Sequence, residues 1–276
     1  MTPEQFAKLS DLLLRRCGLV LPPEKKALAR SRLKPVVQRF GFRDTTELLA
    51  ELPYPSEKLA RAITEAMATN ETSFFRDPAA FEFLACSALP AIARARGQRR
   101  RIRIWCAAAS TGQEIYSLAM IVDESGLAAQ GWKIDLIATD LSEAAIARAE
   151  EGLYAPYEIE RGLEPARLDR YFASETGQWR VADRLRHMVT FRVFNLLDHF
   201  GWLGEVDLIL CRNVLFYFES HAKTLVQAKL ADALAPDGYL FLGDNESADA
   251  QFAPAASRGV FVKHNPTRTA RLAMFG

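Results

Sequence analysis

Cysteine and long apolar runs are scarce in this chain, and each shortage excludes a class of protein. The four cysteines, Cys17, Cys86, Cys106 and Cys211, are spaced too widely for a paired metal-ligand motif. We therefore expect no metal site, and reduced thiols as in a cytoplasmic protein. No stretch approaches the roughly 18 apolar residues that span a bilayer, and residues 1–10 lack the apolar segment of a signal peptide. Membrane insertion and secretion are not expected.

Charge of one sign is not in excess over the whole chain, but charge is unevenly distributed along it. The sequence has 35 Lys and Arg against 34 Asp and Glu. Up to Arg103, however, 19 basic residues face 11 acidic ones, whereas the remainder has 16 and 23. A basic amino-terminal third attracts nucleic acid, anionic lipid or an acidic protein surface. Charge alone does not choose among these partners, and a solvated face without a partner is the remaining interpretation.

Residues 1–68 predict a small helical domain without a strand. Four helical segments are separated by turns, and the segment from about Pro23 to Phe40 has an apolar stripe that includes Leu33. Basic side chains flank this stripe on both sides: Lys26, Arg30, Arg32, Lys34 and Arg39. Pro35 lies inside the same segment, where it removes a backbone donor and is expected to bend or divide the helix.

The middle of the chain predicts a strand, a small-residue loop and a helix in succession. The apolar residues of the strand are Ile102, Ile104 and Trp105, and Ala107–Gly112 has so little side-chain bulk that a ligand can approach the backbone. Ser110 or Thr111 is the expected N-cap of the helix. Glu114 falls in its first turn, where a carboxylate is favoured and can bind a cationic ligand group. An ordinary, tightly packed joint is the alternative interpretation.

Strands and helices alternate from residue 101 onward, which predicts an α/β fold with a mostly parallel, doubly wound sheet. The further strands are expected at residues 134–138, 206–211, 239–242 and 260–263, and helices at 143–151 and 225–234. Residues 163–172 are expected to be helical. Residues 178–193 predict two or three short antiparallel strands that lie apart from the main sheet.

Side chains at the strand ends are candidates for a ligand site. Asp140 ends the second strand and is expected to accept a hydrogen bond from a ribose hydroxyl; helix capping by Asp140 or Ser142 is the alternative. Asn195 offers an amide to an adenine edge, and Leu196 can pack on the ring face. Tyr217, together with Asn213, follows the strand that ends near residue 211.

The polar segment 69–77 is expected to lie where the two parts of the chain meet. It contributes Asn70, Thr72 and Arg76 to the candidate site. The alternative is that these residues only form turns and caps, with Arg76 in a structural salt bridge.

Together these motifs resemble the chemotaxis receptor glutamate methyltransferases (CheR) over nearly the full chain. The motifs are Asn70-x-Thr72-x-Phe74-Phe75-Arg76, Trp105 to Ser117, Asp140, Asn195-Leu196-Leu197 and Arg212-Asn213-Val214-x-x-Tyr217-Phe218. The resemblance implies a Rossmann-like, S-adenosylmethionine-dependent methyltransferase with an all-helical amino-terminal domain (1–68), a linker with leading helices (69–100) and a catalytic domain (101–276) with an antiparallel β insertion at about 173–193. It implies these cofactor contacts: Asn70, Thr72, Arg76, Glu114, Asp140, Asn195, Leu196, Asn213 and Val214.

The implied reaction gives glutamate methyl esters and S-adenosylhomocysteine. A glutamate carboxylate is ionised at neutral pH and needs no base, so catalysis rests on alignment, with Arg76 orienting the carboxylate and Tyr217 positioning the reacting groups. The implied partner is the cytoplasmic helical methylation region of chemoreceptors. The residues expected to dock it are Arg30, Arg32, Lys34 and Arg39.

The sequence departs from the family pattern at three places. Gln113 and Ile115 stand where Glu and Pro are usual, and Gly243–Ser247 matches the expected Gly-His-Ser-Glu only in part. The region 173–193 is short beside members that tether to a receptor's terminal peptide, so tethering is not expected.

Three other classes of protein share some of these features. A nicotinamide dehydrogenase requires Gly-x-Gly-x-x-Gly, which the loop lacks. A nucleic-acid methyltransferase commonly has an Asp/Asn-Pro-Pro-aromatic stretch where this chain has Arg212–Leu215, and nucleic acid is therefore not the expected partner. A noncatalytic cofactor-sensing signalling module is the third alternative.

Overall fold

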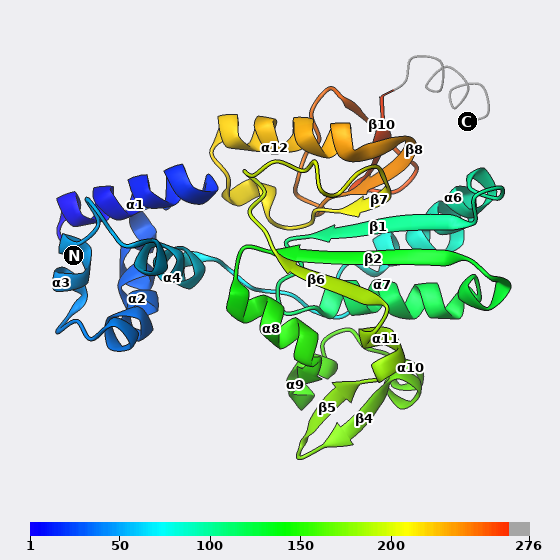
Figure 1. The fold of residues 1–276 in the computed structure, drawn as a ribbon, viewed down its shortest axis with the longest axis horizontal. Helices are drawn as coiled ribbons and strands as arrows, with labels where there is room; N and C mark the ends of the chain where they lie inside the picture. The colour runs from blue at the N-terminus through cyan, green and yellow to red at the C-terminus, as the bar shows by residue number, and fades with distance from the viewer. Residues whose placement is uncertain (265–276) are drawn as a thin grey trace.

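The computed structural model describes residues 1–264 and has a helical amino-terminal part beside an α/β part (Figure 1). The helices of the first part are α1 Pro3–Cys17, the 3-10 turn η1 Pro23–Lys25, α2 Lys26–Phe40, α3 Thr45–Ala50 and α4 Glu57–Met67. The four predicted helical segments are confirmed. They enclose a core of their own, which includes the fully buried Leu9, Leu33 and Ile63.

Local sequence signals explain where α1 and α2 begin and end. The Thr2 side chain accepts a hydrogen bond from the backbone N–H of Gln5, which caps α1, and Gly18 ends it in the left-handed region at φ 71°. Gly41 ends α2 in the same way at φ 75°. Pro35 does not divide α2, which continues through it as one helix. Division, one of the two expected effects of Pro35, was therefore wrong, because packing of the buried face outweighs the one lost hydrogen bond.

Three leading helical segments precede the sheet: α5 Pro78–Phe83, the π-helical η2 Leu84–Ala88 and α6 Leu89–Ala95. The strands of the α/β part are β1 Arg101–Ala107, β2 Lys133–Asp140, β3 Leu153–Tyr154, β4 Phe172–Glu175, β5 Gln178–Val181, β6 Val189–Val193, β7 Val206–Leu210, β8 Leu234–Phe241, β9 Phe252–Pro254 and β10 Val260–Lys263. Its other helices are α7 Gln113–Glu124, η3 Ala128–Gln130, α8 Glu143–Glu151, α9 Pro156–Ile159, α10 Pro165–Tyr171, α11 Asp183–Arg186, η4 Leu215–Tyr217 and α12 Ser220–Ala233.

The main sheet has seven strands in the order β6-β2-β1-β7-β8-β10-β9. The strands from β6 to β8 pair in parallel, and β10 runs antiparallel to both of its neighbours. The strand order reverses beside β1, and ligands of doubly wound sheets bind in the crevice at such a point. The predicted Rossmann-like α/β fold is confirmed.

Side chains of β1 alternate between two cores on opposite faces of the sheet. Ile104 and Cys106 belong to the core on the α7 side, whereas Trp105 belongs to the core on the α12 side. Figure 1 shows α7 and α12 on the two sides of the strands. The apolar run of β1 thus reflects burial on both faces, as expected for a central parallel strand.

The small antiparallel sheet differs from the prediction. It has the order β3-β5-β4 and is drawn from residues 153–181, whereas β6 pairs in parallel with β2 in the main sheet. The expected β insertion at about 173–193 was therefore misplaced at both ends. A short strand's sequence does not reveal its pairing partner, and the partner of β6 lies far away along the chain.

The helical part packs beside the edge of the sheet at which β1 and β2 end (Figure 1). The backbone N–H of Val20 donates to the carbonyl of Tyr217 at 2.9 Å, and Glu219 donates to the carbonyl of Gly18 at 2.8 Å. Leu19 and Phe218 form an isolated antiparallel bridge between these bonds. Within residues 1–264, no helix has both the length and the apolar character needed to cross a membrane.

Candidate active site

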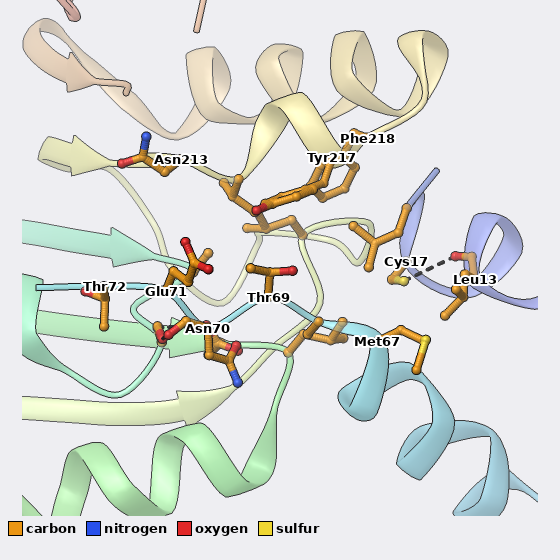
Figure 2. A pocket seen from close by; sticks show the side chains of 18 of the residues that line it. Leu13, Cys17, Met67, Thr69, Asn70, Glu71, Thr72, Asn213, Tyr217 and Phe218 are labelled. Carbon is orange, nitrogen blue, oxygen red and sulfur yellow. Dashed lines mark hydrogen bonds between the residues drawn. The ribbon is translucent and has the colours of Figure 1, made fainter. Parts of the chain in front are cut away.

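A cavity lies between the helical part and the carboxyl edge of the sheet, and the structure brings all the predicted cofactor and catalytic residues to it. These lining residues are Asn70, Thr72, Arg76, Glu114, Asp140, Asn195, Leu196, Asn213, Val214 and Tyr217. Figure 2 shows Asn70 and Thr72 on the linker, with Tyr217 above them and Cys17 and Met67 at the end formed by the helical part. Residues far apart in the sequence therefore form one site.

The loop between β1 and α7 follows a path that only small residues allow. Ala108, Ser110 and Gly112 all have positive φ angles, of 60°, 52° and 95°. A Cβ atom on Gly112 would lie 2.9 Å from both the Tyr154 hydroxyl and the Ala149 Cβ, so a side chain does not fit there. Three residues of this loop, Ala108, Ala109 and Ser110, line the cavity, where the sequence predicted that a ligand can approach the backbone.

Gly112, rather than Ser110 or Thr111, occupies the N-cap position of α7, and no side chain caps that helix. The Ser110 hydroxyl instead donates to the carbonyl of Asn70 at 3.1 Å, and the Thr111 hydroxyl donates to the Gln113 side chain at 2.8 Å. The predicted cap was wrong because the Ser110 hydroxyl has a tertiary partner and the Thr111 hydroxyl bonds to a neighbouring side chain.

Asp140 is a buried carboxylate at the end of β2. Its Oδ2 accepts from the backbone N–H of Ser110 at 2.8 Å, and its Oδ1 accepts from that of Ser142 at 2.9 Å. Ser142, not Asp140, is the N-cap of α8. Burial raises the pKa of Asp140, and these backbone hydrogen bonds act in the opposite direction. Two fixed bonds leave lone pairs for a ligand hydroxyl, which fits the predicted role.

Glu114 lies in the first turn of α7, where it meets an arginine that sequence reasoning did not single out. Arg212 Nη1 donates to Glu114 Oε2 at 2.7 Å and to the carbonyl of Arg76 at 2.9 Å. The Arg212 side chain is only 1% exposed and also pairs with Asp77. Its position directly after a buried strand, inside the Arg212-Asn213 motif, was the available signal.

The second oxygen of Glu114 has a weaker partner. Cys106 Sγ donates to Glu114 Oε1 across 3.6 Å. Burial, followed by the charge of Glu114, raises the pKa of the Cys106 thiol well above its usual value, so the thiol stays protonated and can donate. Oε1 therefore retains acceptor capacity for a cationic group of a ligand.

The linker is held to the α/β core by its two aromatic residues. Phe74 packs edge-on against Tyr154 and Phe172, at centroid distances of 5.1 and 5.5 Å, and the backbone N–H of Phe75 donates to the Ser117 hydroxyl at 2.9 Å. This anchoring holds the preceding residues of the linker against the cavity.

Arg76 remains available at the cavity. Its Nη1 donates to the carbonyl of Glu71 at 3.1 Å, and within residues 1–264 it forms no ion pair. The alternative of a structural salt bridge therefore does not describe this side chain.

Asn195 and Leu196 line the cavity, but the Asn195 side chain already has protein partners. Its Nδ2 donates to the carbonyl of Arg16 at 2.6 Å, and its Oδ1 accepts from the N–H of Leu197 at 3.0 Å. The amide thus ties the wall of the site to α1, and it retains one N–H for a ligand.

Glu246 is a second residue that the sequence prediction missed. Its buried carboxylate accepts hydrogen bonds from the backbone of the loop that carries Asn213 and Val214. The only sequence signal was its place in the partly matching segment Gly243–Ser247.

The four predicted docking residues on α2 do not share one environment. Arg30, Lys34 and Arg39 are exposed and lie outside the cavity lining. Arg32 lines the cavity, and its Nη1 donates to the carbonyl of Met67 at 2.8 Å. Because this guanidinium holds the end of α4, we leave Arg32 out of the docking surface.

The cavity fits an adenosyl ligand with a cationic group. The small-residue loop, the Asp140 carboxylate and the apolar Leu196 suit a nucleoside, and Glu114 suits a positive charge. Within residues 1–264, no group of three or more His, Cys, Asp or Glu side chains is arranged to hold a metal ion.

Comparisons with known proteins agree with this geometry. A family model described as CheR methyltransferase, SAM binding domain, matches residues 70–257, and one described as CheR methyltransferase, all-alpha domain, matches residues 4–67. The chain is 40% identical over 246 residues to Chemotaxis protein methyltransferase 1 of Pseudomonas aeruginosa, covering 88% of this chain and 89% of that protein. It is 33% identical over 256 residues to Chemotaxis protein methyltransferase of Escherichia coli, covering 90% and 85%.

A likeness among solved structures is more distant. The plantazolicin methyltransferase BpumL, in complex with a triazolic desmethylPZN analog and SAH, is 13% identical, with a TM-score of 0.36 over 81% of this chain and 62% of that one. A likeness at this level adds no functional argument.

Proposed function

Because the chain belongs to the CheR methyltransferase family, we propose that it transfers the methyl group of S-adenosylmethionine to glutamate side-chain carboxylates of chemoreceptors. Membership of this family supports S-adenosylmethionine-dependent methyl transfer in chemotaxis. The identity of the methyl acceptor, a receptor glutamate, is our proposal. The observation that supports it most is the cavity lined jointly by Asp140, Glu114, Arg76 and Tyr217. Asp140 can accept a hydrogen bond from a nucleoside. Arg76 and Tyr217 are polar groups suited to a carboxylate that receives the methyl group.

The reaction needs alignment rather than proton transfer. When bound, S-adenosylmethionine supplies a methyl carbon on a sulfonium centre; a glutamate oxygen bonds to that carbon as the carbon–sulfur bond breaks, leaving an ester and S-adenosylhomocysteine. A glutamate carboxylate is ionised near neutral pH, so no base is required. Arg76 would orient the incoming carboxylate, and Tyr217 would help to position it.

A transfer assay tests the proposed acceptor. Purified protein is incubated with methyl-labelled S-adenosylmethionine and chemoreceptor-containing membranes. We expect label on receptor glutamates that mild base releases, since esters are base-labile. Label on nucleic acid, base-stable label, or no transfer by protein that binds the cofactor would each contradict the proposal, the last in favour of a noncatalytic sensor.

An alanine substitution tests the role of Arg76. We expect Arg76→Ala to lower turnover at saturating cofactor by about 100-fold, while the dissociation constant for S-adenosylhomocysteine changes by only a few-fold. The physical reason is that a guanidinium aligning the acceptor acts on the reacting geometry. Loss of cofactor affinity with unchanged turnover at saturation would remove Arg76 from the catalytic role.

Docking of the receptor's acidic helical methylation region is assigned to the exposed cations Arg30, Lys34 and Arg39 on α2. Reversing these charges one at a time, or raising the salt concentration, should weaken methylation of receptor by about tenfold and leave cofactor affinity intact. Lys58→Glu, an equal charge change on the exposed face of α4, is the matched control. Equal losses in the control and the α2 variants would reject docking through α2. Tethering to a receptor's terminal peptide is not part of this proposal.

A further inference from the structure

Glu246 is a buried acid whose partners are backbone N–H groups. It is 7% exposed. Its Oε1 accepts from Val214 at 2.9 Å, Leu215 at 2.7 Å and Phe216 at 3.4 Å. Its Oε2 accepts from Asn213 at 2.7 Å and from Gly243 at 2.7 Å. No Lys, Arg or His of the described residues 1–264 forms an ion pair with it.

Successive backbone N–H groups that converge on one anion form a strong, directional site. Here the anion belongs to the protein itself and lies 33 residues away from Asn213 in the sequence. The bonds hold Asn213 at a positive φ of 56°, a conformation that non-glycine residues seldom adopt. The carboxylate therefore determines the path of the loop that begins there.

That loop forms a wall of the cavity and also contacts the helical part. Asn213, Val214 and Tyr217 line the cavity, and the Tyr217 carbonyl accepts the hydrogen bond from Val20. Glu246 itself is not among the lining residues. Any influence that it has on a ligand must pass through the loop.

We propose that Glu246 is a positioning residue for cofactor binding, acting as an internal anion that fixes the loop from Asn213 to Tyr217. The inference concerns binding of S-adenosylmethionine and its product, so it does not depend on the identity of the methyl acceptor.

A carboxamide is the sharpest probe because its shape is nearly that of a carboxylate. In Glu246→Gln, one oxygen becomes an NH₂ group, which must face either the three N–H donors now at Oε1 or the two now at Oε2. Either choice places donors against donors. Glu219→Gln is the matched control, because Glu219 also accepts backbone N–H bonds, from His221 and Ala222, but lies outside the cavity lining.

A second variant approaches the same contact without removing charge. A Cβ atom on Gly243 would overlap Asn213 Nδ2 and would lie 3.0 Å from Glu246 Oε2. Gly243→Ala therefore forces the Asn213 side chain to move and crowds the carboxylate that holds the loop, while the negative charge remains.

The measurement is calorimetric titration of S-adenosylhomocysteine into the purified full chain, with circular dichroism and thermal unfolding on the same samples. We expect the dissociation constant to rise at least tenfold in Glu246→Gln and Gly243→Ala, both still folded, and to stay within twofold in Glu219→Gln. A merely structural role would lower the unfolding temperature and leave the affinity of the folded protein unchanged.

Three outcomes would overturn the inference. One is a folded Glu246→Gln protein that binds with the original affinity. Another, should that variant not fold, is a folded Gly243→Ala protein with the original affinity. The third is failure of both variants to fold, which would make Glu246 a residue of overall stability instead.

Discussion

The two walls of the cavity are built in different ways. The wall at the ends of β1 and β2 consists of the loop Ala107–Gly112 and Asp140, and its shape follows largely from small residues and neighbouring backbone. The opposite wall, from Arg212 to Phe218, takes its shape from distant side chains, namely Glu114, Asp77 and Glu246. The shape of the first wall depends mainly on backbone conformation and small residues, and that of the second on buried side chains from distant segments.

This difference predicts that damage to the second wall disturbs stability and binding together. Replacing Arg212 by Met leaves Glu114 buried without its ion-pair partner and should lower the free energy of unfolding by about 3–5 kcal/mol. Arg101→Met removes an ion pair with Asp135 in which the Arg101 side chain is 48% exposed and that of Asp135 is 23% exposed. This change should lower the free energy of unfolding by only about 0–1 kcal/mol. Urea unfolding of both variants measures the contrast. Equal costs would show that the buried pair has no special role.

Two glycines of the helical part, Gly18 and Gly41, test whether its contact with the second wall matters. Gly18 and Gly41 both end helices with positive φ, but a Cβ on Gly18 would lie 2.8 Å from Phe218 and 2.9 Å from Ala222, whereas a Cβ on Gly41 meets nothing within 4 Å. Gly41→Ala should cost about 1–2 kcal/mol from its φ angle alone. Gly18→Ala should cost a further ~1–3 kcal/mol, because the added methyl group crowds the second wall.

Thermal unfolding and S-adenosylhomocysteine titration of these two variants give the answer. We expect weakened cofactor binding only in Gly18→Ala, since Phe218 follows Tyr217 in the cavity wall. If both alanine variants behave alike, the junction of the two parts does not shape the site.

The smallest effect is expected at the first wall, as a pH dependence. Burial raises the pKa of Asp140, so on acidification this carboxyl takes up its proton earlier than an ordinary aspartate. A protonated Asp140 loses acceptor capacity, and affinity for S-adenosylhomocysteine should fall as the pH drops through that raised pKa. Calorimetric titration from neutral to mildly acidic pH measures it. The Asp140→Asn variant should bind S-adenosylhomocysteine more weakly over the whole pH range and should not show this fall in affinity. If the variant and the original protein have the same pH profile, another group causes the pH dependence.

Sequence reasoning succeeded where the signal is local. The small-residue loop, the acid at the tip of β2 and the alternation of strands and helices all predicted features that the structure contains. Even there, the N-cap of α7 was misassigned, because the tertiary partner of the Ser110 hydroxyl is the linker carbonyl of Asn70.

Features that depend on a distant partner were not predictable from the sequence. β6 was expected in a small antiparallel sheet. The five residues of β6 do not reveal that β2 is its parallel neighbour. Arg32 was expected to face outward, although it holds the end of α4, and the acceptor role of Glu246 requires knowing where the loop of Asn213 passes. Burial of a charged group becomes visible only when all its neighbours are in place.

The most direct test of the account is amide hydrogen exchange of the purified chain with and without S-adenosylhomocysteine, because it reports on both walls at once. If the ligand occupies the cavity between them, exchange should slow in the peptides that contain Ser110 and Ser142 and also in those that contain residues 213–217. Protection confined to one wall, or located elsewhere on the chain, would contradict a single cofactor site formed by both.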